Sequence, residues 1–108
     1  MTITDEIVEG GTVAHLEGNL DTGTAPETQA HFDGLIADGT STLVADFSAV
    51  DFVSSAGLRV LLATAKKLRP NGALRLYGLN TAVREVFDVS GFSTIIPIFD
   101  DQAAALAG

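Results

Sequence analysis

Two adjacent serines, Ser54 and Ser55, have the types and setting that suggest chemistry most directly. A leucine-patterned segment from Leu58 to Leu68 follows them, so they are expected at or next to the N-cap of a helix. There the first backbone N–H groups lack intrahelical partners and the helix dipole favours negative charge. The junction would therefore tolerate a phosphate. A serine N-cap that contributes about 1 kcal/mol to helix stability is the purely structural alternative.

A small serine hydrolase is the enzymatic alternative at this junction. The segment does not match G-x-S-x-G, and both histidines precede the serines, so no base-bearing motif supports a nucleophile elbow. Asp46 and Asp51 are five residues apart across an expected strand end and loop, which does not identify an acid/base pair. We predict that the chain is not an enzyme.

Metal and cofactor sites have little support in the sequence. His15 and His31 fall in different expected elements, as a sheet-face and a surface residue, and there is no cysteine to complete a zinc site. The glycines form neither a G-x-G-x-x-G turn nor a glycine-lysine pair before a helix. We expect no metal and no cofactor.

The elements around the serines alternate between strand and helix periodicity, which is typical of βα units. The expected strands are Ile3–Val8, Thr12–Glu17, Leu43–Phe47, Ala73–Tyr77 and Ile95–Phe99. The expected helices run from a capping box at Thr24 to near Gly39, from the serines to Pro70, from Asn80 or Thr81 to near Gly91, and from a cap at Asp100 to the end.

The first two strands face each other across Gly10-Gly11 and should form an antiparallel hairpin, with a loop from Gly18 to Asp21 after it. The later strands follow helices and should pair in parallel. Pro97 favours an edge position for the last strand. The sequence thus predicts an α/β fold with a mixed β-sheet packed against α-helices.

Length and composition favour one domain over residues 1–108. A chain of 108 residues with 46% hydrophobic content can build one core. No apolar run approaches the roughly 20 residues that cross a bilayer, and the first residues lack the pattern of a signal peptide. With no cysteine in the chain, we expect a protein of the cytoplasm.

The charge of −8 is unevenly distributed along the chain. All six Lys and Arg residues lie between Arg59 and Arg84, whereas ten of the fourteen acidic residues lie at or before Asp51. Because nucleic-acid affinity depends mainly on cation contacts to phosphates, we expect no direct nucleic-acid or membrane partner. The asymmetry fits either a solvated surface or a charged docking face.

One segment resembles a known family. Residues 46–62, DFSAVDFVSSAGLRVLL, resemble the phosphorylation segment of the STAS-domain anti-sigma factor antagonists of bacteria. The resemblance extends over nearly the whole chain: GNLD at 18–21 with TAP at 24–26 is similar to the family's loop and first helix start, and GALRL at 72–76 to a later strand.

This resemblance implies a single STAS-like domain that acts as a partner-switching regulator of transcription. Family members bind an anti-sigma factor that is itself a serine kinase, and so free a sigma factor. The kinase uses ATP to phosphorylate the antagonist, which releases it, and a serine phosphatase reverses the modification. The alternative is a STAS interaction module of another signalling or lipid-transport assembly.

The resemblance also implies the site residues. The phosphoacceptor is expected at Ser55, with Ser54 as the alternative hydroxyl, because Ser54 stands where relatives often carry aspartate. Exposed parts of the following helix are expected to join the partner-binding face, which comprises Asp21, Thr24, Ser54, Ser55, Ala56, Gly57, Arg59 and Val60. Gly57 is expected to leave room for the close approach of another backbone or of a nucleotide-bearing partner.

Overall fold

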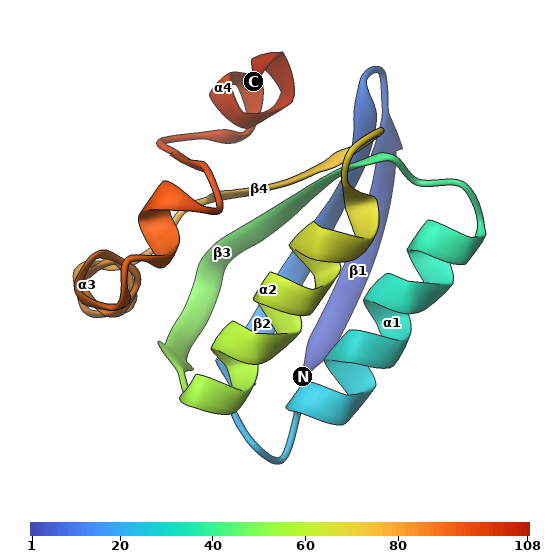
Figure 1. Ribbon diagram of the computed structural model, residues 1–108. Helices are drawn as coiled ribbons and strands as arrows, with labels where there is room; N and C mark the ends of the chain where they lie inside the picture. The colour runs from blue at the N-terminus through green and yellow to red at the C-terminus, as the bar shows by residue number, and fades with distance from the viewer.

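The computed structural model describes residues 1–108 and begins with the expected antiparallel hairpin (Figure 1). Strand β1 (Thr2–Val8) pairs with β2 (Gly11–Leu20), and the turn between them contains Gly10 at φ +97°. Strand β2 begins one residue earlier than predicted and ends three residues later, so residues 18–20 are not loop. They continue the parallel pairing with β3, with register shifts on both sides of Glu17 and Gly18.

Three further strands pair in parallel in the order β1-β2-β3-β4-β5. Strand β3 (Thr42–Val53) is the longest, β4 is Ala73–Tyr77 and β5 is only Ile98–Phe99. The predicted mixed sheet and the edge position of the last strand are both confirmed. The predicted end of β3 at Phe47 is wrong, because its second half continues to pair with the extended part of β2.

Four α-helices connect or follow these strands. They are α1 (Ala25–Ala37), α2 (Ser55–Leu68), α3 (Thr81–Ser90) and α4 (Gln102–Ala107), and a short 3₁₀ turn, η1 (Phe92–Thr94), lies between α3 and β5. Helices α1 and α2 lie side by side on one face of the sheet, and α3 lies beside the second half of β3 (Figure 1). None of the helices has the length and hydropathy needed to cross a membrane.

The main core fills the space between the sheet and these helices. Alternate residues of β3 point into it, including Leu43 and Phe47, and meet Phe32 of α1 and Leu61 of α2. A smaller cluster lies on the opposite face of the sheet, where Ala105 of α4 covers two strand residues, Val13 and Val44. The sheet is therefore covered fully on one face and only in part on the other.

Two predicted caps differ from the structure. The Thr24 side chain makes no cap hydrogen bond; its hydroxyl instead donates to the Asn19 carbonyl at 2.7 Å, so the predicted capping box with Glu27 is wrong. The last helix is capped by Asp101, one residue after the predicted Asp100, through a bond from the Ala104 N–H at 2.8 Å. In both cases the loop geometry before the helix decides which side chain reaches the free N–H groups.

Candidate functional site at the β3–α2 junction

The junction between β3 and α2 is a tightly specified turn. Ser54 is the N-cap, with φ −90° and ψ 175°, and its Oγ accepts a hydrogen bond from the Gly57 N–H at 3.3 Å. The Ser54 N–H donates to the Leu20 carbonyl at 2.9 Å, which fixes the turn to the end of β2. The hydroxyl of Ser54 is therefore half-buried and already serves as the helix cap.

Ser55 differs from its neighbour in both exposure and bonding. It is the first residue of α2, is exposed, and its hydroxyl makes no hydrogen bond within the chain. Negative charge at this position faces the unpaired N–H groups of the first helical turn and the positive end of the helix dipole. Of the two hydroxyls, the one on Ser55 is both accessible and free.

Gly57 is buried beneath the junction. A Cβ at this position would lie 2.6 Å from the Leu20 carbonyl oxygen and 2.8 Å from Leu20 Cγ, both too close for real contacts. The expected close approach to Gly57 is therefore made by the chain's own β2 backbone. Of the two alternatives expected for Gly57, the close approach of another backbone is the one that the structure shows, and no room is left for a nucleotide-bearing partner.

The first turns of α2 divide into an exposed and a buried side. Arg59 is exposed and forms no ion pair, and Ala56 is half-buried. Val60 is only 6% exposed and belongs to the main core, so its expected exposure is wrong. It lies three residues after Gly57 and four before Thr64, which are also buried, and this helical spacing places all three on the core side.

The turn between β2 and α1 lies at the same end of the sheet, because Leu20 is paired with Val53 (Figure 1). In this turn the Asp21 Oδ1 accepts hydrogen bonds from the N–H groups of Gly23 at 3.0 Å and Thr24 at 3.2 Å. Asp21 and Thr24 are both half-buried. The structure thus places this turn at the same end of the sheet as Ser54, and it gives Asp21 and Thr24 a role in shaping the turn.

A polar network that the sequence analysis missed lies on the partly covered face of the sheet. His15 Nδ1 lies 2.6 Å from Asp46 Oδ2, and His15 Nε2 lies 2.9 Å from Glu6 Oε1. The Ser48 hydroxyl donates to Asp46 Oδ1 at 2.6 Å. Strand alternation could have placed these side chains on one face, but only the register of β1, β2 and β3 brings them into contact.

This network perturbs the ionisation of its members. Hydrogen bonds to Glu6 and then Asp46 raise the pKa of His15. Burial alone would raise the pKa of Asp46, but bonds from Ser48 and His15 lower it overall. Burial and the neighbouring Asp46 raise the pKa of Tyr77 to about 12. These shifts favour a protonated His15 held between carboxylates, which is a structural ion-pair arrangement.

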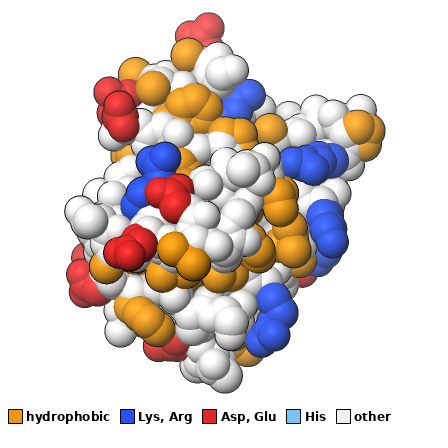
Figure 2. All heavy atoms as spheres, turned by 60° about the vertical axis from the view of Figure 1, so that its left-hand side comes forward, with side chains coloured by type: hydrophobic (Ala, Val, Ile, Leu, Met, Phe, Trp, Pro, Cys, Tyr) orange, Lys and Arg blue, Asp and Glu red, His pale blue; other side chains and the backbone are white.

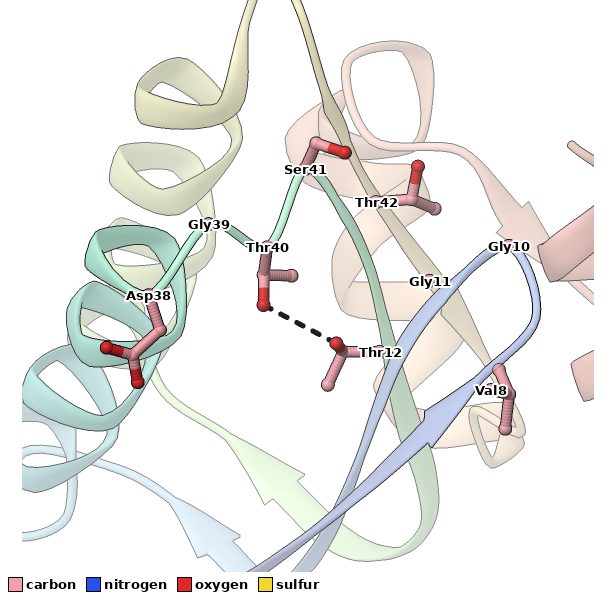
Figure 3. A pocket seen from close by; sticks show the side chains of 9 residues that line it. All are labelled: Val8, Gly10, Gly11, Thr12, Asp38, Gly39, Thr40, Ser41 and Thr42. Atoms are coloured by element: carbon pink, nitrogen blue, oxygen red, sulfur yellow. Dashed lines mark hydrogen bonds between the residues drawn. The ribbon is translucent and has the colours of Figure 1, made fainter.

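A polar pocket of about 330 Å³ lies at the opposite end of the sheet from the serine junction (Figure 3). Its lining comes from the β1–β2 turn and the loop before β3, and Thr12 and Thr40 approach across it at 3.4 Å between hydroxyl oxygens. Asp38 is its one titratable side chain. The pocket offers hydroxyls but no base or cation, so we place the candidate site at the β3–α2 junction.

Comparison with known proteins adds a family and several relatives. The STAS domain family model matches residues 2–105. A protein of Bordetella bronchiseptica, BtrV, which is named as a candidate anti-sigma factor antagonist, is 38% identical over 108 residues that cover 99% of this chain and 93% of that protein. RsfB of Mycobacterium tuberculosis, named an anti-sigma-F factor antagonist, is 28% identical over 100% of this chain and 88% of its own length.

The fold has a close counterpart among solved structures. The crystal structure of an anti-sigma factor antagonist from Mycobacterium paratuberculosis superposes with a TM-score of 0.91 at 30% sequence identity. The superposition covers 98% of this chain and 91% of that one. The similarity in sequence and in fold therefore extends over nearly the whole length of both proteins.

Proposed function

This chain belongs to the STAS domain family, and we propose that within it the protein is an anti-sigma factor antagonist that switches partners through phosphorylation of Ser55. The observation that carries this proposal is the contrast between the two serines. Ser54 is committed to capping α2, whereas the Ser55 hydroxyl is exposed and free. The names of the relatives, BtrV and RsfB, supply the class of regulator.

The position of Ser55 makes phosphorylation compatible with the fold. A phosphate on the first helical residue gains from the free N–H groups and the dipole of α2. Arg59 lies one helical turn further along the same side and has no ion-pair partner of its own. The modified protein is therefore expected to stay folded while the charge of its surface changes.

The unmodified surface around Ser55 is the proposed docking site for an anti-sigma factor that is a serine kinase. It comprises the exposed or half-buried residues Asp21, Thr24, Ser54, Ser55, Ala56 and Arg59. The added charge of about −1.5 to −2 would have to be desolvated in the complex, so phosphorylation dissociates the partner. A serine phosphatase restores binding. In this proposal the protein is a binding module of the cytoplasm, not an enzyme.

The first test is phosphorylation by the cognate kinase and ATP, followed by peptide mass spectrometry. We expect phosphate on Ser55 in the parent protein and in Ser54→Ala, and none in Ser55→Ala. Ser54→Ala is the matched control, because it removes the neighbouring hydroxyl and lowers stability by about 1 kcal/mol through loss of the cap. Phosphate on Ser54 alone, or on neither serine, would contradict the proposal.

Binding to the anti-sigma factor gives a second readout. Ser55→Asp should weaken binding by about tenfold or more, since it places a charge in the contact, whereas Ser55→Ala should bind but resist release by ATP. Equal binding by Ser55→Asp and the parent protein would show that charge at this position does not control the complex.

A further inference from the structure

Helix α3 carries apolar residues on its exposed surface as well as on the side that packs on the core. Val83 and Phe87 are buried in the main core, and Val86 is half-buried and packs against that core. Ala82 and Val89 lie four residues before and three residues after Val86 and are exposed. Val89 is 82% exposed. A helix of this amphipathic type needs only one apolar side to pack on its own sheet, so the outer side is free for another contact.

Phe52 of β3 extends this outer side toward the serine junction. Its side chain is 51% exposed, and a hollow of about 190 Å³ lies between it and Val86. Ala82 lines this hollow and also the shallow depression next to it that contains Val89. We call the surface formed by Phe52, Ala82, Val86 and Val89 the α3 groove.

The exposed apolar atoms of this face are contiguous. Figure 2 shows hydrophobic side chains in a band that runs across the face that carries α3, with acidic side chains mainly in the left half of the view and basic ones mainly along its right edge. Single exposed apolar residues are ordinary, as with Ile7 on β1, which is 88% exposed. Contiguous apolar surface rimmed by charge marks an interaction site.

The charged residues around the α3 groove indicate which kind of partner segment would bind there. The carboxylates of Asp51 and Glu85 line the groove, and neither takes part in an ion pair. Asp88, on the same helix, is already paired with Arg84 at 3.3 Å. A segment with an apolar side chain between Lys or Arg residues would match this pattern. A second copy would bring the same carboxylates and a charge of −8, which opposes self-association.

The groove is also continuous with the proposed docking site. Asp51, Phe52 and Val53 line the hollow, and the chain runs directly from them into Ser54 and Ser55. We propose that the α3 groove binds a basic amphipathic segment of the same anti-sigma factor that docks at Ser55. This inference rests on the proposed function, since it assigns that partner a second contact.

The test is calorimetric binding of the purified cognate anti-sigma factor to variants of the full chain. We test a single variant, Val89→Ser, and a double variant that combines it with Phe52→Ser. Each should weaken binding by about tenfold or more, as expected when an apolar anchor is removed. Ile7→Ser is the matched control, because it removes an equally exposed apolar side chain from the other edge of the sheet. Thermal unfolding checks that each variant is folded. If the double variant does not fold, the binding of the single variant Val89→Ser still tests the inference.

The charge part of the inference has its own variant. Glu85→Lys should weaken binding more at about 50 mM salt than at about 500 mM, because screening shortens the range of repulsion. Glu9→Lys, in the exposed hairpin turn, is the control and should change binding little.

Each result decides between the two proposals. If Ser55→Asp weakens binding while the groove variants bind like the parent, the inference is overturned and the proposed function stands. If the parent protein does not bind an anti-sigma factor, both fail. If the parent forms dimers that Val89→Ser converts to monomers in analytical ultracentrifugation, the occupant is a second copy and the inference is wrong.

Discussion

His15 shows how single residues acquire properties that their type alone does not give. It is held between Glu6 and Asp46, with both ring nitrogens within 2.9 Å of a carboxylate oxygen. These partners come from β1 and β3, the two strands on either side of its own. Protonated His15 therefore joins three neighbouring strands on the face of the sheet that α1 and α2 leave open.

This arrangement predicts a pH dependence of stability. Because the folded protein raises the pKa of His15, its contribution is fully present below the unfolded pKa of about 6.5 and is lost as pH rises through the folded pKa. The side chain is 34% exposed, so screening keeps the effect below about 1 kcal/mol. His15→Gln should lower the free energy of unfolding more at about pH 6 than at about pH 8, measured by urea titration. An equal loss at both pH values would contradict it.

At the scale of elements, the contact between β2 and α2 positions the serine junction. Leu20 at the end of β2 accepts the Ser54 N–H and also contacts Gly57. This contact leaves no space for a side chain at position 57 in the first turn of α2. The residue that looked like an opening for a partner is instead the point where helix and sheet meet most closely.

Gly57→Ala should therefore destabilise the protein although alanine is the better helix former. The new Cβ would lie 2.6 Å from a backbone oxygen, so the start of α2 must shift, at a cost of about 1–3 kcal/mol. Gly34→Ala in α1 is the matched control: a Cβ there meets no atom within 4 Å, and we expect a gain of roughly 0.5–1 kcal/mol. Chemical denaturation of both variants measures the contrast, and a stabilising Gly57→Ala would refute the packing argument.

At the scale of the whole molecule, the two faces of the sheet are covered unequally. Helix α4 provides the cover on the second face through Ala105, and its carbonyl accepts a bond from Arg75 at 3.0 Å. The Tyr77 hydroxyl adds a 3.2 Å bond to Gln102. The C-terminal helix is thus held to β4 by a few polar bonds and to β2 and β3 by one small apolar cluster.

Ala105→Asp should detach α4 or lower global stability by about 2 kcal/mol or more, because an unpaired carboxylate would be placed in the apolar cluster. Ala103→Asp is the control, since Ala103 is exposed on the same helix. Hydrogen exchange of the α4 amides together with thermal unfolding distinguishes local detachment from global loss. Unchanged protection and stability in Ala105→Asp would show that α4 does not cover this face.

The sequence by itself determined the order and type of most elements, the mixed pairing of the sheet and the position of the serines at a helix start. These follow from local periodicity and caps, which need only neighbouring residues. Tertiary structure decided how far β3 extends, since strand pairing and not local pattern sustains residues 48–53. It also decided that Val60 and Gly57 are buried, and that Ser54 caps α2 while Ser55 is free. Exposure and hydrogen bonding depend on what the rest of the chain places nearby, and no local pattern carries that information.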